Sequence, residues 1–357
     1  MKKVTRNVLL LLLLAACAAW GQPKKIVVLG QSAELVAALR DGAPENVRIV
    51  HVPNPRSDAD VVEIVADAPE AGTDRASLLD VVADAHAIIG SPPRRVLLAA
   101  KQLEWLQITS AGVKPYLHPE IVESDVVMTN AKRLSSAAIA DHGFAMLLAL
   151  TRNLNHFIPD RTKEEWVRNN YGLVELEGKT ALVVGTGGIG SNVARRAKAF
   201  GMRVIGVDPE EFPPRQIFDR MVYPDRLDQV VPEADVVFLC VPHTKDSEGM
   251  FGASQFELMK KDSYFIALSR GKIYDQGGLI KALDSQRLAG AGVDVTDPEP
   301  LPKGNPLWKF DNMIITPHVA TQGELGTPLR VELFKDNIAR FAAGEKLRNV
   351  VDMVKEY

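Results

Sequence analysis

The apolar positions of the first third of the chain fall into short runs with helical patterns between them. Short, mostly apolar runs occur at residues 25–29, 47–52, 87–90 and 105–108. Runs of this length are typical of buried strands, and the pattern after the first run places apolar residues on one side of a helix. Strands that alternate with helices predict parallel β-α-β units.

A second series of the same kind follows a long apolar segment. Residues 135–152 are predicted to form a helix, and strand and helix patterns then alternate from 180 to 317. Residues 325–343 predict a final helix whose apolar residues make one face. The tail after residue 317 is too short to be a domain. We therefore expect its helix to return to the first unit, with the second unit inserted into the first.

The composition is that of a globular protein with about two domains. The chain has 357 residues, of which 46% are hydrophobic and 24% charged, and its formal net charge is -3. This near-neutral charge gives no electrostatic basis for binding nucleic acid. The only cysteines are Cys17 and Cys240, so we expect no disulfide framework. We also expect no metal, because no ligand-spaced pair occurs among His51, His86, His118 and His156.

Residues 1–21 have the pattern of an export signal. A basic start precedes a wholly apolar run, residues 8–16, which is shorter than the roughly 20 residues that span a bilayer. The segment Leu-Ala-Ala-Cys that ends at Cys17 is similar to a bacterial lipobox, in which the cysteine would carry a lipid. Simple cleavage after Ala18 or Gly21 is the alternative. We expect export to the periplasm or cell envelope, and a cytoplasmic location if this interpretation is wrong.

A glycine-rich turn opens the second series. The apolar run 181–184 leads into the segment Gly185-Thr186-Gly187-Gly188-Ile189-Gly190, and a helical pattern follows. In a GxGxxG turn the glycines permit the turn, the approach of a pyrophosphate to the backbone, and close packing of the helix on the strand. The helix N-terminus offers free N–H groups to the phosphates. The next strand, 203–207, ends at Asp208, which can accept both hydroxyls of the adenosine ribose.

Acidic residues after this strand favour NAD over NADP. The carboxylate of Asp208 would repel a 2′-phosphate, and Glu210 and Glu211 would add to the repulsion unless they belong to a solvated loop. Arg215, which lies several residues further on, leaves an NADP-binding alternative open. We predict NAD.

Three polar residues of the second series stand at the ends of predicted strands. Arg270 follows the apolar run 264–268, Glu299 lies in a turn after a strand, and His318 follows Ile314-Ile315-Thr316-Pro317. Ligand sites of open α/β sheets lie at such carboxyl ends. Hydride transfer to a keto acid needs a cation that binds the carboxylate and polarises the carbonyl. It also needs an acid that protonates the oxygen, and a partner for that acid.

The order of these motifs resembles the D-isomer-specific 2-hydroxyacid dehydrogenase family. The resemblance covers nearly all of the chain after the export signal and is densest over 180–320, which contains GTGGIG, LSRG, GVDVTDPEPLP and ITPHVA. It implies that Arg270 binds the carboxylate and carbonyl of the substrate. It implies that His318 is the general acid/base. Glu299 would then hydrogen-bond His318, orient it and favour its protonated form.

The resemblance implies further contacts. Backbone N–H groups of a loop in the first unit would bind the substrate carboxylate; this loop is Ser110-Ala111-Gly112. Asp294 would lie near the nicotinamide carboxamide, and other residues would line the cofactor, namely Cys240, Val241, Pro242 and Ser269. Cys240 also lies in an apolar run that predicts a buried side chain. For His142 we expect packing or an ion pair on its helix rather than catalysis.

We therefore predict an α/β protein with two doubly wound parallel-sheet domains. A Rossmann NAD-binding domain, residues 131–319, is inserted into a flavodoxin-like substrate domain made of 22–130 and 320–357. The resemblance implies a homodimer that pairs through the cofactor domain, with Trp166 in a polar stretch that could contribute to the contact.

The predicted activity is NAD-dependent hydride transfer between nicotinamide and C2 of a small D-2-hydroxy acid or 2-keto acid. The resemblance points to a glyoxylate/hydroxypyruvate reductase-like or phosphoglycerate dehydrogenase-like member of the family. Two alternatives stay open. One is a catalytically silent NAD(H)-sensing or scaffold protein of the same fold, and the other is the same fold acting on phosphite or a bulkier hydroxy acid.

Overall fold

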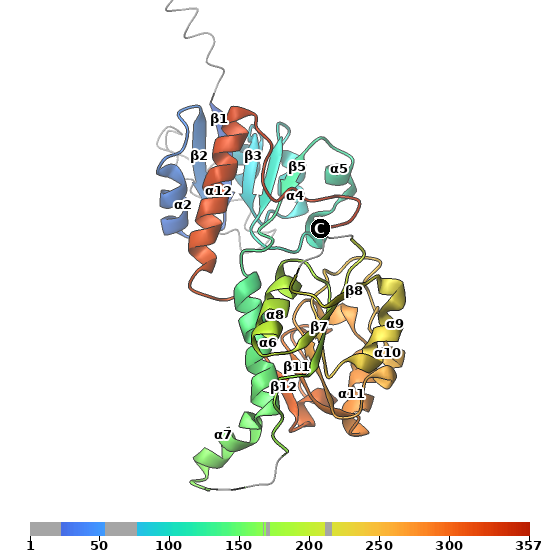
Figure 1. Ribbon diagram of the computed structural model, residues 1–357. Helices are drawn as coiled ribbons and strands as arrows, with labels where there is room; N and C mark the ends of the chain where they lie inside the picture. Colours follow the sequence, from blue (N-terminus) through green and yellow to red (C-terminus); the bar gives the residue numbers. More distant parts are fainter. Residues whose placement is uncertain (1–22, 54–76, 167, 169–171, 211–215) are drawn as a thin grey trace, which may run out of the picture. The chain divides into compact units, whose positions relative to one another are not determined.

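Figure 1 shows the computed structural model, which describes residues 23–53, 77–166, 168, 172–210 and 216–357. The predicted export signal lies outside these residues, as do Cys17, Glu211 and Arg215. Within the described parts of the chain, no helix has the length and apolar character needed to cross a membrane.

The chain divides into two compact units. Unit 1 comprises Met1–Lys132 and Thr327–Tyr357, and unit 2 comprises Arg133–Gly326. The sequence predicts the second boundary after residue 319, whereas the observed division follows residue 326. The turns after His318 stay with unit 2 because their backbone bonds to it, as the Ala320 N–H does to Asp294.

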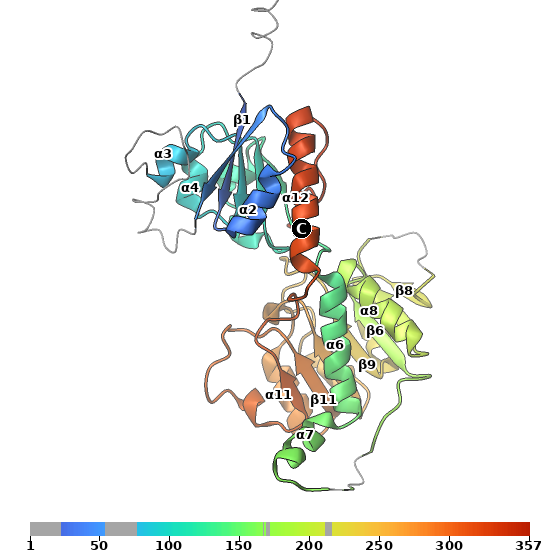
Figure 2. The same ribbon diagram turned by 90° about the vertical axis from the view of Figure 1, so that its left-hand side faces the viewer.

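Unit 1 contains a five-stranded parallel sheet with the order β2-β1-β3-β4-β5. Its strands are β1 (Lys24–Leu29), β2 (Val47–Val52), β3 (Ala87–Gly90), β4 (Trp105–Ile108) and β5 (Val127–Thr129). Its helices are α2 (Ala33–Arg40), α3 (Leu78–Val82), α4 (Arg94–Ala99), α5 (Pro119–Val122) and α12 (Gly326–Ala343), with a 3-10 turn, η2 (Lys114–Tyr116). Helices α2 and α12 cover one face and α3 and α4 the other (Figure 2). This order confirms the predicted flavodoxin-like sheet.

The tail helix α12 is tied to the sheet of unit 1 by buried polar and aromatic groups. The amide of Asn337 donates to the side-chain oxygen of Gln107 at 3.0 Å. The ring of Phe341 lies 5.2 Å from that of Trp105, measured between centroids. The sequence pattern predicts a helix with Phe341 on its apolar face, and the sheet of unit 1 supplies the surface that this face covers.

Unit 2 contains a seven-stranded parallel sheet with the order β12-β11-β10-β9-β6-β7-β8. Its strands are β6 (Thr180–Val184), β7 (Arg203–Val207), β8 (Arg220–Val222), β9 (Val236–Leu239), β10 (Ser263–Ala267), β11 (Leu288–Val293) and β12 (Met313–Ile315). Its helices are α6 (Ser136–Thr151), α7 (Leu154–Thr162), α8 (Gly188–Ala199), α9 (Leu227–Val230), α10 (Ala253–Leu258) and α11 (Gln276–Asp284). The 3-10 turns are η3 (Pro224–Arg226), η4 (Val231–Glu233), η5 (Gly271–Ile273) and η6 (Pro306–Lys309).

The strand order of unit 2 reverses at β6, which pairs with β7 on one side and β9 on the other. This is the Rossmann arrangement, and it confirms the prediction. Side chains of β6 alternate between two cores: Leu182 and Val184 face one cluster, and Ala181 and Val183 face the other. Helices α6 and α8 lie on one face, with α9, α10 and α11 on the other (Figure 1). The reversal leaves a crevice for a ligand beyond the carboxyl ends of the strands.

Like the short strand β5, helix α7 is an element that the apolar pattern does not predict. It follows Asn153, whose left-handed backbone (φ 56°) separates it from α6. None of its residues is buried. Leu154, Phe157 and Ile158 do have helical spacing, but Pro159 lies inside the segment, and a proline at such a position argues against a helix.

Candidate active site

The glycine-rich loop after β6 has the geometry of a dinucleotide cradle. Gly185 has φ +90°, and a Cβ there would lie 2.7 Å from the backbone nitrogen of Val241. A Cβ on Gly190 would lie 1.9 Å from the carbonyl oxygen of Gly185, so only glycine lets α8 pack this closely on β6. A Cβ on Gly187 would meet nothing within 4 Å. The backbone at the start of α8 therefore faces open space, which fits a pyrophosphate on the helix N-terminus.

The carboxylate of Asp208, at the end of β7, is held in place by this loop. One oxygen accepts hydrogen bonds from the backbone N–H (2.7 Å) and the hydroxyl (3.0 Å) of Thr186. The other accepts from the N–H of Glu210 at 3.1 Å. A carboxylate has about four acceptor positions, so this fixed group keeps capacity for a further donor such as a ribose hydroxyl. The sequence motif does not predict that Thr186 orients Asp208.

The other predicted cofactor-lining residues follow the ends of the neighbouring strands. Cys240 and Val241 continue β9 and are buried, and the Cys240 N–H donates to Val184 at 2.8 Å. Pro242 accepts a hydrogen bond from the hydroxyl of Ser247 at 2.6 Å. Ser269 is buried after β10. The burial of Cys240 confirms the predicted buried side chain. This burial raises the pKa of the thiol, which keeps it protonated.

His318 and Glu299 form a direct pair after β12 and β11. The Nδ1 of His318 lies 2.9 Å from one carboxylate oxygen of Glu299, and both side chains are about a third exposed. The other Glu299 oxygen accepts the N–H of Thr296 at 3.0 Å, so the carboxylate is fixed to its own turn. Because Glu299 engages Nδ1, the Nε2 of His318 is the ring nitrogen available for proton exchange.

The negative charge of Glu299 also acts on Arg270. Its guanidinium donates to the carbonyl of Ser269 at 2.6 Å. Burial lowers the pKa of Arg270 and the negative charge of Glu299 opposes this shift. A guanidinium remains charged under such conditions, so Arg270 is a partly buried cation. The positive charge, the carboxylate and the imidazole thus lie at the carboxyl ends of adjacent strands, as the sequence predicts.

A glycine allows the Arg270 turn to pack against the Glu299 turn. A Cβ on Gly271 would lie 2.0 Å from the carbonyl carbon of Thr296. The hydroxyl of Tyr274 donates to the carbonyl of Val295 at 2.8 Å and adds a second link. Burial, with the charge of Glu299, raises the pKa of Tyr274, so it stays a neutral donor. Gly271 and Tyr274 are positioning residues whose role the sequence pattern does not predict.

Asp294 lies beneath the His318 loop. Its buried carboxylate accepts hydrogen bonds from the hydroxyl of Thr316 (2.6 Å) and from the N–H groups of Val319 (2.9 Å) and Ala320 (3.0 Å). His142, for which the sequence predicts packing or an ion pair on its helix, instead reaches Thr316 at 2.8 Å. About one acceptor position of Asp294 is left for a carboxamide donor.

The loop with the predicted substrate-carboxylate donors belongs to unit 1. It follows β4, and its shape is held by bonds to the chain after β5. Asn130 donates to the carbonyl of Ala111 at 2.7 Å, and Ala131 N–H donates to Ser110 at 3.0 Å. The hydroxyl of Ser110 closes the turn by donating to Gly112 at 2.8 Å. Within unit 1 these contacts make a preformed loop at the carboxyl edge of the sheet.

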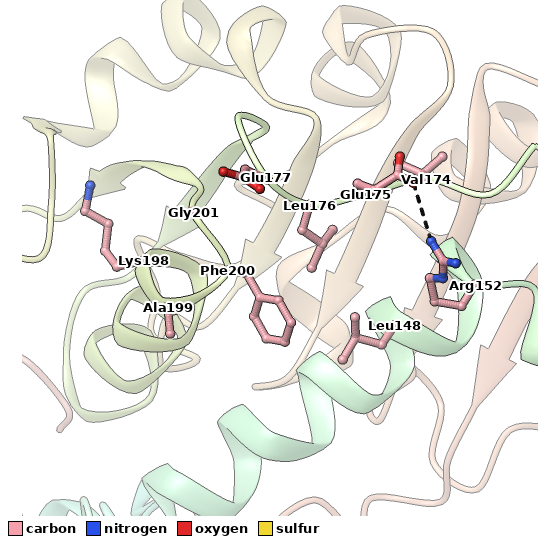
Figure 3. Close-up of a pocket in the computed structure, with 10 residues that line it drawn as sticks. All are labelled: Leu148, Arg152, Val174, Glu175, Leu176, Glu177, Lys198, Ala199, Phe200 and Gly201. Carbon is pink, nitrogen blue, oxygen red and sulfur yellow. Dashed lines mark ion pairs between the residues drawn. The ribbon is translucent and has the colours of Figure 1, made fainter.

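A hollow of about 540 Å³ in unit 2 contains none of the predicted site residues (Figure 3). It is lined by Leu148, Arg152, Val174, Glu175, Leu176, Glu177, Lys198, Ala199, Phe200 and Gly201. Arg152 and Glu175, which both line it, form an ion pair at 3.9 Å. Among the residues that the structure describes, no group of three or more His, Cys, Asp or Glu side chains could hold a metal ion.

Comparisons with known proteins identify the region that carries this site. Residues 144–320 match the family model described as D-isomer specific 2-hydroxyacid dehydrogenase, NAD binding domain. The D-3-phosphoglycerate dehydrogenase of Methanocaldococcus jannaschii is 31% identical over 82% of this chain and 57% of its own length. The glyoxylate reductase of Korarchaeum cryptofilum is 30% identical over 79% of this chain and 87% of its own length.

A solved structure agrees over almost the whole chain. The D-isomer specific 2-hydroxyacid dehydrogenase family protein from Aeromonas salmonicida has a TM-score of 0.76 and 28% identity. The match covers 93% of this chain and all of that one (100%). By contrast, the chain spans about half the length of the phosphoglycerate dehydrogenases that it matches, 57% of one and 49% of another. The family-matched region includes the glycine-rich loop and Arg270, Glu299 and His318.

Proposed function

Because this chain belongs to the D-isomer specific 2-hydroxyacid dehydrogenase family, we propose that it is an NAD-dependent dehydrogenase. It transfers a hydride between the nicotinamide ring and C2 of a small D-2-hydroxy acid or 2-keto acid. The observation that carries this proposal is the 2.9 Å pair of His318 and Glu299. This pair lies in the same unit as the partly buried cation Arg270 and the dinucleotide cradle.

The chain's own groups perform the proton transfer and the charge stabilisation. When bound, the dinucleotide supplies the hydride for reduction and accepts it in oxidation. Arg270 binds the substrate carboxylate and polarises the carbonyl. As hydride reaches C2, His318 donates the proton on Nε2 to the carbonyl oxygen, which gives the hydroxy acid. The carboxylate of Glu299 stabilises the charged ring before the transfer, and the reverse reaction returns the hydroxyl proton to His318.

We propose that the substrate is a small 2-keto acid, such as glyoxylate or hydroxypyruvate. The names of the relatives support this class, because they include glyoxylate reductases and a glycerate dehydrogenase. The fixed carboxylate of Asp208 supports NAD rather than NADP, because a second negative charge at the 2′ position would lie against it.

The test is consumption of NADH and NADPH by the purified full chain with a panel of small 2-keto acids. We expect turnover with at least one of them and a preference for NADH. Binding of NADH without turnover of any keto acid, by a folded protein, would overturn the proposal. That outcome would favour the NAD(H)-sensing alternative, for which the next measurement is NADH-dependent association with a partner or with itself.

We propose that the protein forms a homodimer through unit 2. The family resemblance supports this, as do large apolar side chains on and after α7: Trp166 is 94% exposed and Ile158 is 58% exposed. The hollow of Figure 3, with Phe200 at its edge, lies in the same unit. Light scattering should give a dimer that Ile158→Asp converts to monomer. The matched control Val354→Asp, at another exposed apolar side chain in unit 1, should leave the dimer intact. A monomeric wild-type chain would contradict this proposal.

We also propose export, with lipidation at Cys17 or simple cleavage nearby. The support is the basic start, the short apolar run and the lipobox-like sequence. Cell fractionation with metabolic lipid labelling separates the outcomes. A labelled envelope protein that loses its label in Cys17→Ser indicates lipidation, and an exported unlabelled protein indicates simple cleavage. Recovery only from the cytoplasm, with residues 1–21 still attached, would overturn export.

A further inference from the structure

The backbone of His318 adopts an unusual conformation. Its φ is 54°, in the left-handed region that side chains other than glycine rarely occupy. Conformations of this kind persist only where the surrounding contacts hold them, and they cluster at functional sites. The contacts that hold this loop therefore decide where the imidazole ring lies.

Asp294 provides most of those contacts. Its carboxylate accepts the N–H groups of Val319 and Ala320, at 2.9 and 3.0 Å, directly after His318. Its own backbone carbonyl accepts the N–H of His318 at 2.9 Å. The side chain of Asp294 is only 1% exposed, so water does not compete for these bonds. One residue thus holds the backbone on both sides of the His318 side chain.

The direction of the next two hydrogen bonds follows from the chemistry of a hydroxyl group. Thr316 has one O–H hydrogen, and it donates this hydrogen to Asp294 at 2.6 Å. The contact of 2.8 Å between Thr316 and the Nε2 of His142 must then have the histidine as donor. His142 therefore carries a hydrogen on Nε2, and the bonds run in one direction from His142 through Thr316 to Asp294.

The position of His142 is itself rigid. It lies on α6, next to the buried Gly143. A Cβ on Gly143 would lie 2.6 Å from the Cδ1 atom of Leu268, two residues before Arg270, so the helix approaches β10 closely at this point. The Nε2 of His142 also lies 3.7 Å from a carboxylate oxygen of Asp294.

We propose that His142 is a positioning residue for His318. Its Nε2–H fixes the Thr316 hydroxyl so that this hydroxyl donates to Asp294, and Asp294 then holds the left-handed loop that orients the His318 ring. The expected effect on turnover rests on the proposed function. The expected effect on the loop does not, because the loop contacts exist in the protein without substrate. Without His142, the Thr316 hydroxyl loses the donor that directs it, and the loop can relax.

The first experiment compares His142→Leu, which removes the donor, with His142→Gln, whose amide can donate from a similar reach. We expect His142→Leu to lower kcat by about tenfold to a hundredfold, because misplacing a reacting group by about 1 Å has effects of this size. NADH affinity and the KM for the keto acid should change little, and His142→Gln should recover most of kcat. The matched control is Asp141→Ala, which removes an exposed ion pair with Arg196 from the same helix and should leave kcat unchanged.

The second experiment measures amide hydrogen exchange at Val319 and Ala320 in the protein without cofactor. Both amides should exchange faster in His142→Leu and return toward wild type in His142→Gln. Thr316→Val cuts the same chain of bonds from its other end, so its effects should not add to those of His142→Leu. This variant also keeps the test available if His142→Leu does not fold.

The outcomes separate the two proposals. Unchanged kcat in His142→Leu, additive effects with Thr316→Val, or unchanged exchange at both amides would each overturn the positioning role while the dehydrogenase activity stands. A wild-type protein without turnover would overturn the proposed function, and the exchange measurement would still decide whether His142 holds the His318 loop.

Discussion

Two polar networks in this protein differ in how completely their groups are satisfied. In unit 1, Trp105, Gln107, Thr129 and Asn337 are completely buried, and each of their side-chain polar atoms has a hydrogen-bond partner. In unit 2, His318 and Glu299 are about a third exposed and the Nε2 of His318 is left for another partner.

The difference separates polar groups that stabilise the fold from polar groups that can take part in the reaction. A buried network with every group paired is rigid, and removing one member leaves the others unsatisfied. A partly exposed pair with an unused ring nitrogen adds little to stability, but it can exchange a proton with a ligand. The comparison therefore predicts that substitutions in the first network lower stability, whereas substitutions in the second lower activity.

The largest expected effect is that of His318→Ala on turnover. Loss of a general acid/base typically lowers a rate by about a hundredfold to ten-thousandfold, and we expect kcat for the reactive keto acid to fall in this range. The temperature of unfolding should change little, because the side chain is partly exposed and its partner Glu299 keeps its bond to Thr296. Steady-state kinetics and thermal unfolding check both parts. A large loss of stability with a small loss of kcat would mean that His318 stabilises the fold and does not act in the reaction.

Asp208→Ala should change the choice between NADH and NADPH. Thr186 holds the carboxylate of Asp208, which retains capacity for a ligand. Asp208 is therefore a group that acts on ligands rather than one that stabilises the fold. Two unit charges about 4 Å apart interact by about 1–4 kcal/mol between water and a protein surface, so the NADH preference should fall by roughly fivefold to a thousandfold. The ratio of kcat/KM for the two cofactors measures it. Thr186→Val, which keeps the charge but removes one bond to it, should give a smaller shift in the same direction. An unchanged ratio in Asp208→Ala would show that another group sets the preference.

Asn337→Ala tests the buried network of unit 1, in which every side-chain polar atom has a hydrogen-bond partner. It removes the amide that donates to Gln107 and accepts the N–H of Arg348 at 2.7 Å. A buried polar group left without a partner costs about 1–3 kcal/mol, so we expect the free energy of unfolding to fall by about this amount. Urea unfolding measures the change, and kcat of the folded enzyme should stay at its wild-type value. The control Lys335→Ala, on the same helix, removes only a surface ion pair with Asp41 and should have almost no effect. Equal effects of the two variants would contradict a structural role for the network.

The sequence predicts most of the fold because burial leaves a pattern in it. Strands such as Ala87–Gly90 and Arg203–Val207 are mostly apolar runs whose bounds agree with the structure. Helix α7 has no buried residue, and Pro159 inside it is a sequence signal against a helix. Arg270, Glu299 and His318 can be found because each follows a strand within a recognisable motif.

The contacts that hold these residues could not be predicted in the same way. The bond from His142 to Thr316 joins positions 174 residues apart, and periodicity carries no information about which side chains meet across a sheet. The same is true of Gly271, whose need for glycine appears only when Thr296 lies against it. Local pattern therefore identifies the groups that perform the chemistry, whereas their orientation depends on long-range packing.

The smallest expected effect belongs to a third kind of polar group, which is exposed and already paired. Asp219 accepts from Lys198 at 2.7 Å and from the N–H of Val204 at 2.7 Å, and these bonds lower the pKa of its carboxyl group below the ordinary value of 3.8. A carboxyl group whose pKa is lower in the folded than in the unfolded protein stabilises the fold above the unfolded pKa. This contribution is lost as the pH falls through the folded value.

Asp219→Asn should therefore lower the free energy of unfolding at neutral pH by about 0.2–1 kcal/mol, a range typical of exposed pairs. The difference from wild type should vanish once the pH falls below the folded pKa of Asp219, where the native carboxyl is also neutral. Urea unfolding of both proteins across this acidic range measures it, and high salt should reduce the neutral-pH difference by screening the pair. A difference that persists in acid would contradict this prediction, because both side chains are then neutral and both keep an oxygen that can accept the N–H of Val204.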